Sequence, residues 1–285
     1  MNQIFFGGLS AASLGTADFL AGLTGRTVGH ANALLAVFIV SCVGMSVYML
    51  AGGHPMEIDL PAQWLIVLFG LMNTVAMLLL YKALALGPLS VAAPIVAAHP
   101  AAVVMFAFAL GSRPSVGQWI GMAMAMAGAI IVARASTEEG TELERQSHGK
   151  TVLVATAACI AYAVLIISGQ HSVPLHGEPQ TLWLGRIVAL VCLLLFFLIS
   201  RRAPALPVKW LPVLCVQGLL DFGGVLFLLF GSSGEFSEIT AVISSLFGGV
   251  TVLLAWIFLK EKISAIQWAG VAIILIGVGC LTYFA

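Results

Sequence analysis

The chain has 285 residues, of which 61% are hydrophobic and only 8% are charged, and its formal net charge is zero. Soluble domains carry about 25% charged residues, so this composition excludes a soluble enzyme, a nucleic-acid binder and a disordered chain. A surface made of such residues has to face lipid, which makes the lipid bilayer the first expected partner.

Ten apolar runs follow one another along the chain, each close to the length of about 20 residues that a helix needs to span a bilayer. In chain order they cover residues 3–23, 32–52, 62–86, 89–110, 116–135, 150–169, 179–200, 209–230, 237–259 and 264–284. Because they are apolar around the whole circumference of a helix, they predict spanning helices and not the alternating strands of a membrane barrel. No basic residue precedes the first run, so we expect a spanning helix there and no cleavable signal peptide.

All five cysteines lie inside apolar runs, and none forms a Cys-x-x-Cys pair or has a histidine close by in the sequence. They are Cys42, Cys159, Cys192, Cys215 and Cys280. We interpret them as small buried hydrophobic side chains, and we expect no disulfide framework, no metal site and no cofactor.

The polar segment 136–149 divides the chain into two halves of five runs each. Residues 115–128 align with residues 264–277 at a constant offset of 149, with six identities in fourteen positions. This similarity predicts an internal duplication, with repeats 1–135 and 150–285 joined by a polar cytoplasmic linker at 136–149. Because five is odd, the second repeat has to enter the membrane in the opposite orientation.

The basic residues support this inverted arrangement. Ten of them lie in or beside the odd-numbered connections between the runs, whereas the even-numbered connections hold Arg113 alone. The ten are Arg26, Lys82, Arg134, Arg145, Lys150, Arg201, Arg202, Lys209, Lys260 and Lys262. The positive-inside rule places the odd-numbered connections in the cytoplasm and both termini on the other side of the membrane.

Two stretches resemble the EamA-type repeat of the drug/metabolite transporter superfamily, namely residues 81–133 and 229–281. The second has the Leu259-Lys260-Glu261 turn, and both have a Gln-Trp-x-Gly helix start, but the first has Gly111-Ser112-Arg113 where the family usually has the glutamate. The resemblance implies an all-α integral membrane protein, with ten transmembrane helices in two inverted five-helix repeats around a central cavity. Its members move amino acids, nucleotide sugars, drugs and other small metabolites, and within the superfamily the sequence resembles bacterial exporters of (aromatic) amino acids.

Charges inside a bilayer cost about 2.5–3.5 kcal/mol on insertion scales, so each one needs a reason. Asp221 lies at the middle of its run and aligns with Asn73 at an offset of 148. It is a candidate for substrate binding and for proton coupling, or it packs helices by bonding a neighbouring group. Asp18 is a second coupling candidate, although it lies nearer a helix end and could reach the interface. Arg186 could extend to the interface or pair with an acid.

Helix-weakening residues lie at the centre of one run in each repeat. Pro94 and His99-Pro100 interrupt the fourth run, and Gly248-Gly249 occupies the equivalent place in the ninth. Matching weak points near the midplane indicate a transporter's binding site, and they make these prolines and glycines hinge candidates. The alternative for the glycines is close helix packing. His99 could titrate, bond a carboxylate or stack on an aromatic ring.

Hydroxyl groups add polarity to the same helices. The substrate-binding residues that we predict are Asn73, Tyr81, His99, Tyr162, Asp221, Ser244, Ser245 and Gly248, and the coupling candidates are Asp18, His99 and Asp221. A phosphorylated substrate would favour Arg and Lys clamps. No basic cluster occurs in the runs, so a neutral, zwitterionic or aromatic solute fits better.

The function predicted is a secondary transporter that exports small neutral or zwitterionic metabolites, amino acids first, across the bacterial inner membrane by alternating access. We expect a monomer that is not an enzyme, with protons as a candidate coupling ion and both termini in the periplasm. The alternatives are a membrane-embedded enzyme, a channel or non-transporting sensor, and a carrier of other drug-like solutes. The sequence holds no catalytic or P-loop motif that would favour an enzyme.

Overall fold

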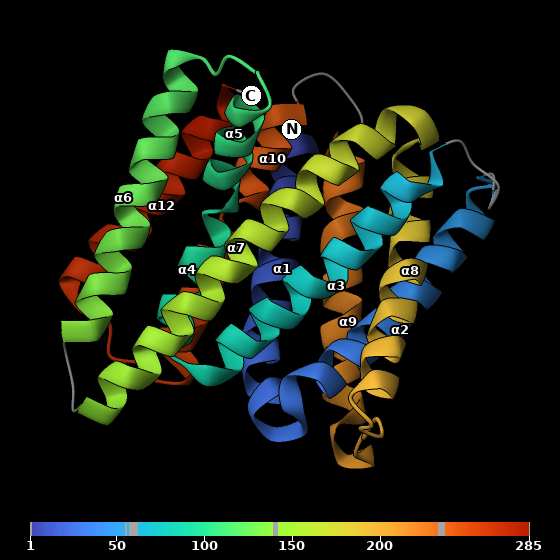
Figure 1. Ribbon diagram of the computed structural model, residues 1–285, viewed down its shortest axis with the longest axis horizontal. Coiled ribbons are helices and arrows are strands. Elements are labelled where there is room, and N and C mark those ends of the chain that lie inside the picture. The colour runs from blue at the N-terminus through green and yellow to red at the C-terminus, as the bar shows by residue number, and fades with distance from the viewer. Residues whose placement is uncertain (1, 55, 57–61, 139–141, 233–236, 285) are drawn as a thin grey trace.

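The computed structural model describes residues 2–54, 56, 62–138, 142–232 and 237–284, and every regular element in these ranges is a helix (Figure 1). The first repeat contains α1 (Asn2–Thr24), the π-helical turn η1 (Gly25–Gly29), α2 (His30–Ala51), α3 (Gln63–Leu86), α4 (Leu89–Ala97), α5 (His99–Ala109) and α6 (Val116–Glu138). The second contains α7 (Glu142–His176), α8 (Glu178–Ile199), the short 3-10 helix η2 (Val208–Trp210), α9 (Leu211–Ser232), α10 (Ser237–Ser244), α11 (Phe247–Phe258) and α12 (Ala265–Tyr283).

Within the described residues, nine helical segments are long and apolar enough to cross a membrane. The first of them, Gln3–Ala51, has 49 residues. At 1.5 Å per residue it would be about 74 Å long, more than twice the hydrocarbon core of a bilayer. It crosses twice, because the chain reverses at η1, where Gly29 has a φ of +93°. The predicted all-helical fold with about ten crossings is therefore confirmed.

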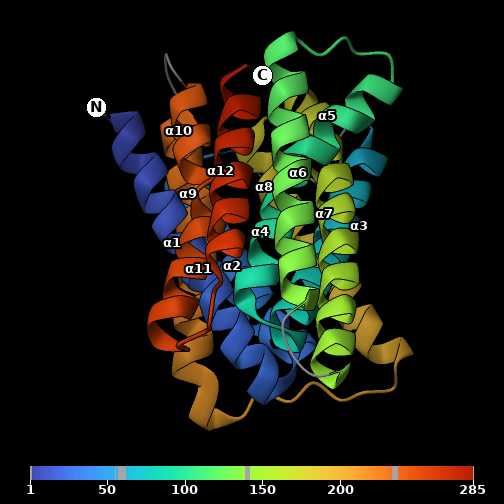
Figure 2. The same cartoon turned by 90° about the vertical axis from the view of Figure 1, so that its left-hand side faces the viewer.

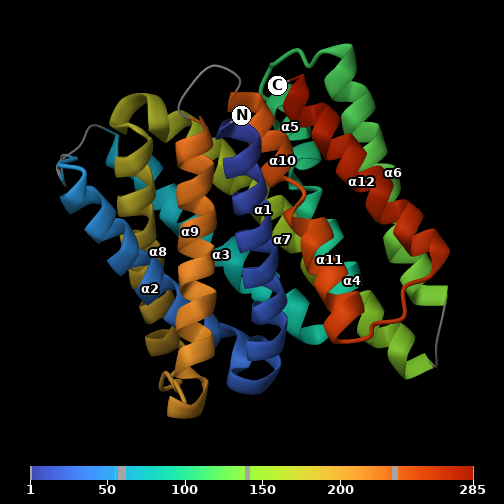
Figure 3. The same ribbon diagram turned by 180° about the vertical axis from the view of Figure 1, so that it is seen from behind.

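The two chain ends lie at the same end of the molecule, as an even number of crossings requires (Figures 1 and 3). The turn η1 and the α8–α9 and α11–α12 connections lie at the opposite end. These three regions hold Arg26, Arg201, Arg202, Lys209, Lys260 and Lys262. The positive charges thus gather at the end without the termini.

The packing shows the inverted repeat directly. Helix α1 of the first repeat packs on α9 of the second, and α3 of the first packs on α7 of the second. Because α1 is equivalent to α7 and α3 is equivalent to α9, these are the same contact with the repeats exchanged. Helices α6 and α12 lie side by side at one edge (Figure 2). There, a Cβ atom on Gly121 would lie 2.8 Å from the carbonyl oxygen of Gly277, and one on Gly128 would lie 2.7 Å from that of Gly270. The offset of 149 exchanges these two contacts.

Each repeat has one spanning helix in two pieces, as the sequence predicts. In the first repeat the break falls at Ala98, between α4 and α5. Because Pro100 has no backbone N–H, the carbonyl of Val96 loses its helical partner. The Nδ1 atom of His99 lies 3.1 Å from that carbonyl oxygen and takes the place of the missing donor.

In the second repeat the break lies at Ser245-Leu246, between α10 and α11, and not at Gly248-Gly249, where the sequence analysis put the weak point. The hydroxyl of Ser245 donates to the carbonyl of Val242 at 2.6 Å, a local bond that competes with the helical ladder. Gly248 instead lets α11 approach α4, since a Cβ atom there would lie 2.7 Å from the Cβ of Ala97.

Candidate substrate site

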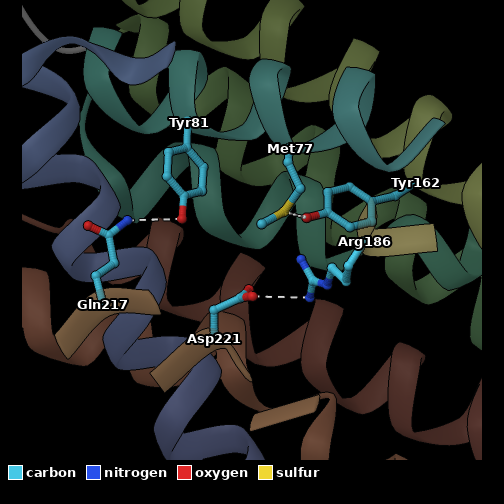
Figure 4. Close-up of polar contacts among 6 residues, drawn as sticks. All are labelled: Met77, Tyr81, Tyr162, Arg186, Gln217 and Asp221. Carbon is cyan, nitrogen blue, oxygen red and sulfur yellow. Dashed lines mark hydrogen bonds and ion pairs between the residues drawn. The ribbon is translucent and has the colours of Figure 1, made fainter. Parts of the chain in front are cut away.

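One face of α3 carries the first part of the site. Asn73, Met77 and Tyr81 are buried and recur every four residues, so they share this face. The face meets the second repeat: the Tyr162 hydroxyl on α7 donates to the Met77 sulfur at 2.7 Å (Figure 4). Symmetry-related Asn73 and Asp221 were both predicted as site residues, and both are buried.

Gln217 and Asp221, four residues apart on α9, form the opposite wall. Gln217 is fully buried; its amide nitrogen donates to the Tyr81 hydroxyl at 2.9 Å, and its oxygen accepts from the Thr24 hydroxyl at 2.8 Å. One amide thus joins α1, α3 and α9. Gln217 could not be predicted as a site residue from its charge, because it is an uncharged residue within an apolar run. Its position one helical turn before Asp221 was the available signal.

The centre of the site is a buried ion pair. Arg186 on α8 places Nη2 3.0 Å from Oδ2 of Asp221, and the two side chains are only 10% and 9% exposed. The contact lacks the alignment of a hydrogen bond, and the Nη1 atom of Arg186 has no hydrogen-bond partner among the described residues. The ring centroid of Phe38 lies 5.9 Å from the guanidinium carbon, within cation–π range. Of the two alternatives for Arg186, pairing with an acid is the one observed.

Asp18 adds a second carboxylate to this centre. It is half-buried on α1, which packs against α9, and it lies within electrostatic reach of Asp221, Tyr81 and Tyr162. No described cation pairs with it. Asp18 therefore belongs to the cluster around the ion pair and does not extend to the interface.

His99 joins the cluster through an aromatic contact. Its ring stacks on Tyr162 with centroids 5.4 Å apart and the planes tilted by 34°. Of the three roles open to His99, stacking is the one that the geometry displays, together with the bond to the Val96 carbonyl. We use "central cluster" below for Asp18, Met77, Tyr81, Tyr162, Arg186, Gln217 and Asp221, with Asn73 and His99 beside it.

The two serines of α10 have other partners. The hydroxyl of Ser244 lies 2.8 Å from that of Ser10, which also donates to the carbonyl of Gly224 at 2.8 Å. Ser10 lies eight residues from Asp18, about 12 Å along α1. Five of the eight predicted substrate residues lie in or beside the central cluster, namely Asn73, Tyr81, His99, Tyr162 and Asp221. Gly248 contacts α4 at Ala97. Ser244 and Ser245 make helix contacts.

One hollow described in the structure lies away from the central cluster. It has a volume of about 720 Å³ at the end opposite the termini, and its walls are Trp256, Ile257 and residues 260–264. Glu261 in this wall accepts hydrogen bonds from the backbone N–H groups of Leu89 and Ser90 at 2.9 and 3.0 Å. The cluster's charges and polar partners, and not the size of this hollow, make the cluster the candidate site. Among the described residues, no three His, Cys, Asp or Glu could hold a metal ion together.

Two inverted repeats, each with a divided helix, and a charged cluster between them define an integral membrane protein with a transporter fold. The chain belongs to the EamA-like transporter family, whose model matches it twice, at residues 1–134 and 149–283. A solved crystal structure, described only as that of a protein, is similar over 97% of each chain with a TM-score of 0.62 at 18% identity, which supports the fold. No curated protein matches the sequence.

Proposed function

We propose that this transporter exports small neutral or zwitterionic metabolites, amino acids first, across the bacterial inner membrane by alternating access. Family membership supports the transport of small solutes by a multi-pass membrane protein. The proposal takes residues 1–135 and 150–285 as the moving repeats, joined by the cytoplasmic linker 136–149, of which residues 139–141 lie outside the described ranges.

The main support for the proposal is that polar bonds within the central cluster join the two repeats. Tyr81 and Met77 of the first repeat bond to Gln217 and Tyr162 of the second. Any rearrangement of one repeat against the other has to change these bonds. Polar groups inside a membrane are costly, and they mark substrate and ion pathways in transporters. A solute that bonds to the same groups could take over the contacts that the repeats release.

Protons are the proposed coupling ion. Asp18 and Asp221 lie within electrostatic reach of each other, yet only Asp221 has a basic partner among the described residues. Two carboxylates with one cation between them can hold a proton when a solute leaves, which fits exchange of solute against protons.

The experiment that tests the function is uptake into proteoliposomes that contain the purified protein. Each amino acid is offered in labelled form, with and without an imposed pH gradient. Carrier transport predicts a rate that saturates with solute concentration and responds to the gradient. A rate proportional to concentration would favour the channel alternative, and no flux of any amino acid would contradict the proposed substrates.

A further inference from the structure

The free end of the Arg186 guanidinium has no role in the ion pair. A guanidinium has five N–H donors in a planar fork and usually holds a carboxylate with two parallel bonds. Here only Nη2 meets Asp221, through a contact that is not an aligned hydrogen bond, while the buried Nη1 has no hydrogen-bond partner among the described residues. Buried donors without acceptors are rare, and each needs an explanation.

The surroundings of Nη1 indicate what it could bind. Figure 4 shows this nitrogen pointing away from Asp221, toward the side on which Met77 and Tyr162 lie. Tyr162 lies within electrostatic reach of Arg186 and of both carboxylates, and it is half-buried. Among the described residues, Asp221 is the carboxylate that contacts Arg186, which leaves Nη1 open to an acceptor on a bound solute.

We propose that Nη1 of Arg186 binds the carboxylate of a zwitterionic substrate and that Asp18 binds the substrate's ammonium group. This inference rests on the proposed function, because it assigns the substrate class of the same site. The substrate class is an α-amino acid with both charges free, and Arg186 is its specificity-determining residue.

The charge balance of the cluster favours a zwitterion over the other two charge types. The cluster has one base, Arg186, and two acids, Asp18 and Asp221. An anion without an ammonium group would be repelled by two nearby carboxylates, whereas a cation without a carboxylate would leave Nη1 without an acceptor. A zwitterion gives Nη1 an acceptor and Asp18 a cation in one step.

The first part of the test compares substrate analogues on the purified full-length protein. Binding of the twenty amino acids is measured by calorimetry, and the tightest is compared with its amide, its decarboxylated amine and its N-acetyl derivative. We expect each analogue to bind at least tenfold more weakly. Equal binding of the amide or the amine, or no binding by any of the twenty, would overturn the proposal.

The second part uses variants that keep the buried charges balanced. Arg186→Gln combined with Asp221→Asn removes both members of the ion pair, and Lys82→Gln, an exposed residue at the end of α3, is the matched control. We expect the double variant to lose the preference for the amino acid over its amide, and the control to keep it. A double variant that is folded by thermal unfolding and still prefers the acid tenfold would refute Arg186 as the anchor.

Failure of the inference and failure of the proposed function are distinguishable. Saturable flux of solutes without preference for the free carboxylate would leave a carrier but remove the anchor. Binding that requires the carboxylate, without flux in proteoliposomes, would leave the anchor but remove the transport function.

Discussion

Glu261 of the second repeat caps the helix that starts at Leu89 of the first. Its two carboxylate oxygens accept from the backbone N–H groups of Leu89 and Ser90 at 2.9 and 3.0 Å. The N-cap residue of α4, Pro88, has no side-chain hydrogen bond to offer, so the donors depend on this distant carboxylate. The equivalent position in the first repeat, at the offset of 149, is Ser112. The contact therefore ties the two repeats together at the end opposite the termini.

Replacing Glu261 should loosen this connection. Glu261→Gln retains one acceptor but loses the charge that favours a helix N-terminus, so we expect a loss of about 1 kcal/mol in the free energy of unfolding. Lys262→Gln, an exposed neighbour, is the control and should behave as the wild type. Chemical denaturation in detergent measures both. Equal stability of Glu261→Gln and the wild type would show that the cap contributes nothing.

The ion pair makes a prediction about non-additivity. Arg186→Gln alone leaves Asp221 buried without its cation, which typically costs about 3–5 kcal/mol. Adding Asp221→Asn should restore much of that loss, because no unpaired charge remains. Denaturation of both single variants and the double variant gives the coupling energy. A double variant whose loss equals the sum of the single losses would mean that the two side chains do not interact.

The bond between Gln217 and Tyr81 can be tested in the same way. Gln217→Leu removes the donor to the Tyr81 hydroxyl and one of the two acceptors of the Thr24 hydroxyl, the other being the carbonyl of Leu20. We expect a loss of about 1–3 kcal/mol in stability. In a Tyr81→Phe background the same change should cost less, since one of the two hydroxyls is already absent. Thermal unfolding of the four proteins checks this. An identical loss in both backgrounds would argue against the bond.

The two adjacent glycines of α11 should respond differently to alanine. A Cβ atom at Gly248 would lie 2.7 Å from Ala97, and we expect Gly248→Ala to destabilise by about 1–3 kcal/mol through overpacking. At Gly249 the nearest atom is the end of the flexible Leu275 side chain, at 2.9 Å, which can move. Gly249→Ala is the matched control and should keep its stability. If both variants were equally stable, close packing at Gly248 would be a wrong interpretation.

Gly249→Ala also tests the proposed hinge, together with Pro100→Ala. The latter restores a backbone donor for the carbonyl of Val96, which His99 now occupies. If α4–α5 and α10–α11 bend during transport, both variants should transport more slowly than the wild type while they remain folded. Unchanged rates in both, measured in proteoliposomes, would leave packing as the only role of these residues.

Much of the fold could be predicted from the sequence because its causes are local or compositional. The length and apolar character of a run decide whether it spans, and the repeat follows from matching segments such as 115–128 and 264–277. The position of the second helix break could not be predicted in this way. Gly248-Gly249 permits a bend, but the hydroxyl of Ser245 and the approach of Ala97 decide where the helix is interrupted.

The site was predictable only in part. Burial of a charge near the midplane pointed to Asp221, and the repeat offset pointed to Asn73. Whether Arg186 reaches the interface or an acid depends on which helices face each other, which the sequence of one helix does not contain. The position of Asp18 in its apolar run puts it near a helix end, yet the packing of α1 on α9 places it in the cluster.

The orientation in the membrane is a further prediction. From the basic residues at η1 and at the α8–α9 and α11–α12 connections we expect that end in the cytoplasm and both termini in the periplasm. A reporter that is active only in the cytoplasm should be silent when it is fused after the C-terminus, and active when it is fused after Arg202. The opposite pattern would place both termini in the cytoplasm and these connections in the periplasm.

Counterflow in proteoliposomes tests directly whether the two repeats expose one amino-acid site alternately to each side. Vesicles with purified protein are loaded with the unlabelled amino acid that binds most tightly, and the labelled form is added outside at low concentration. We expect the label to accumulate transiently above its outside concentration in wild-type vesicles, and not to accumulate with the Arg186→Gln/Asp221→Asn variant. Label that only equilibrates in wild-type vesicles, at the same rate with or without the internal amino acid, would contradict alternating access.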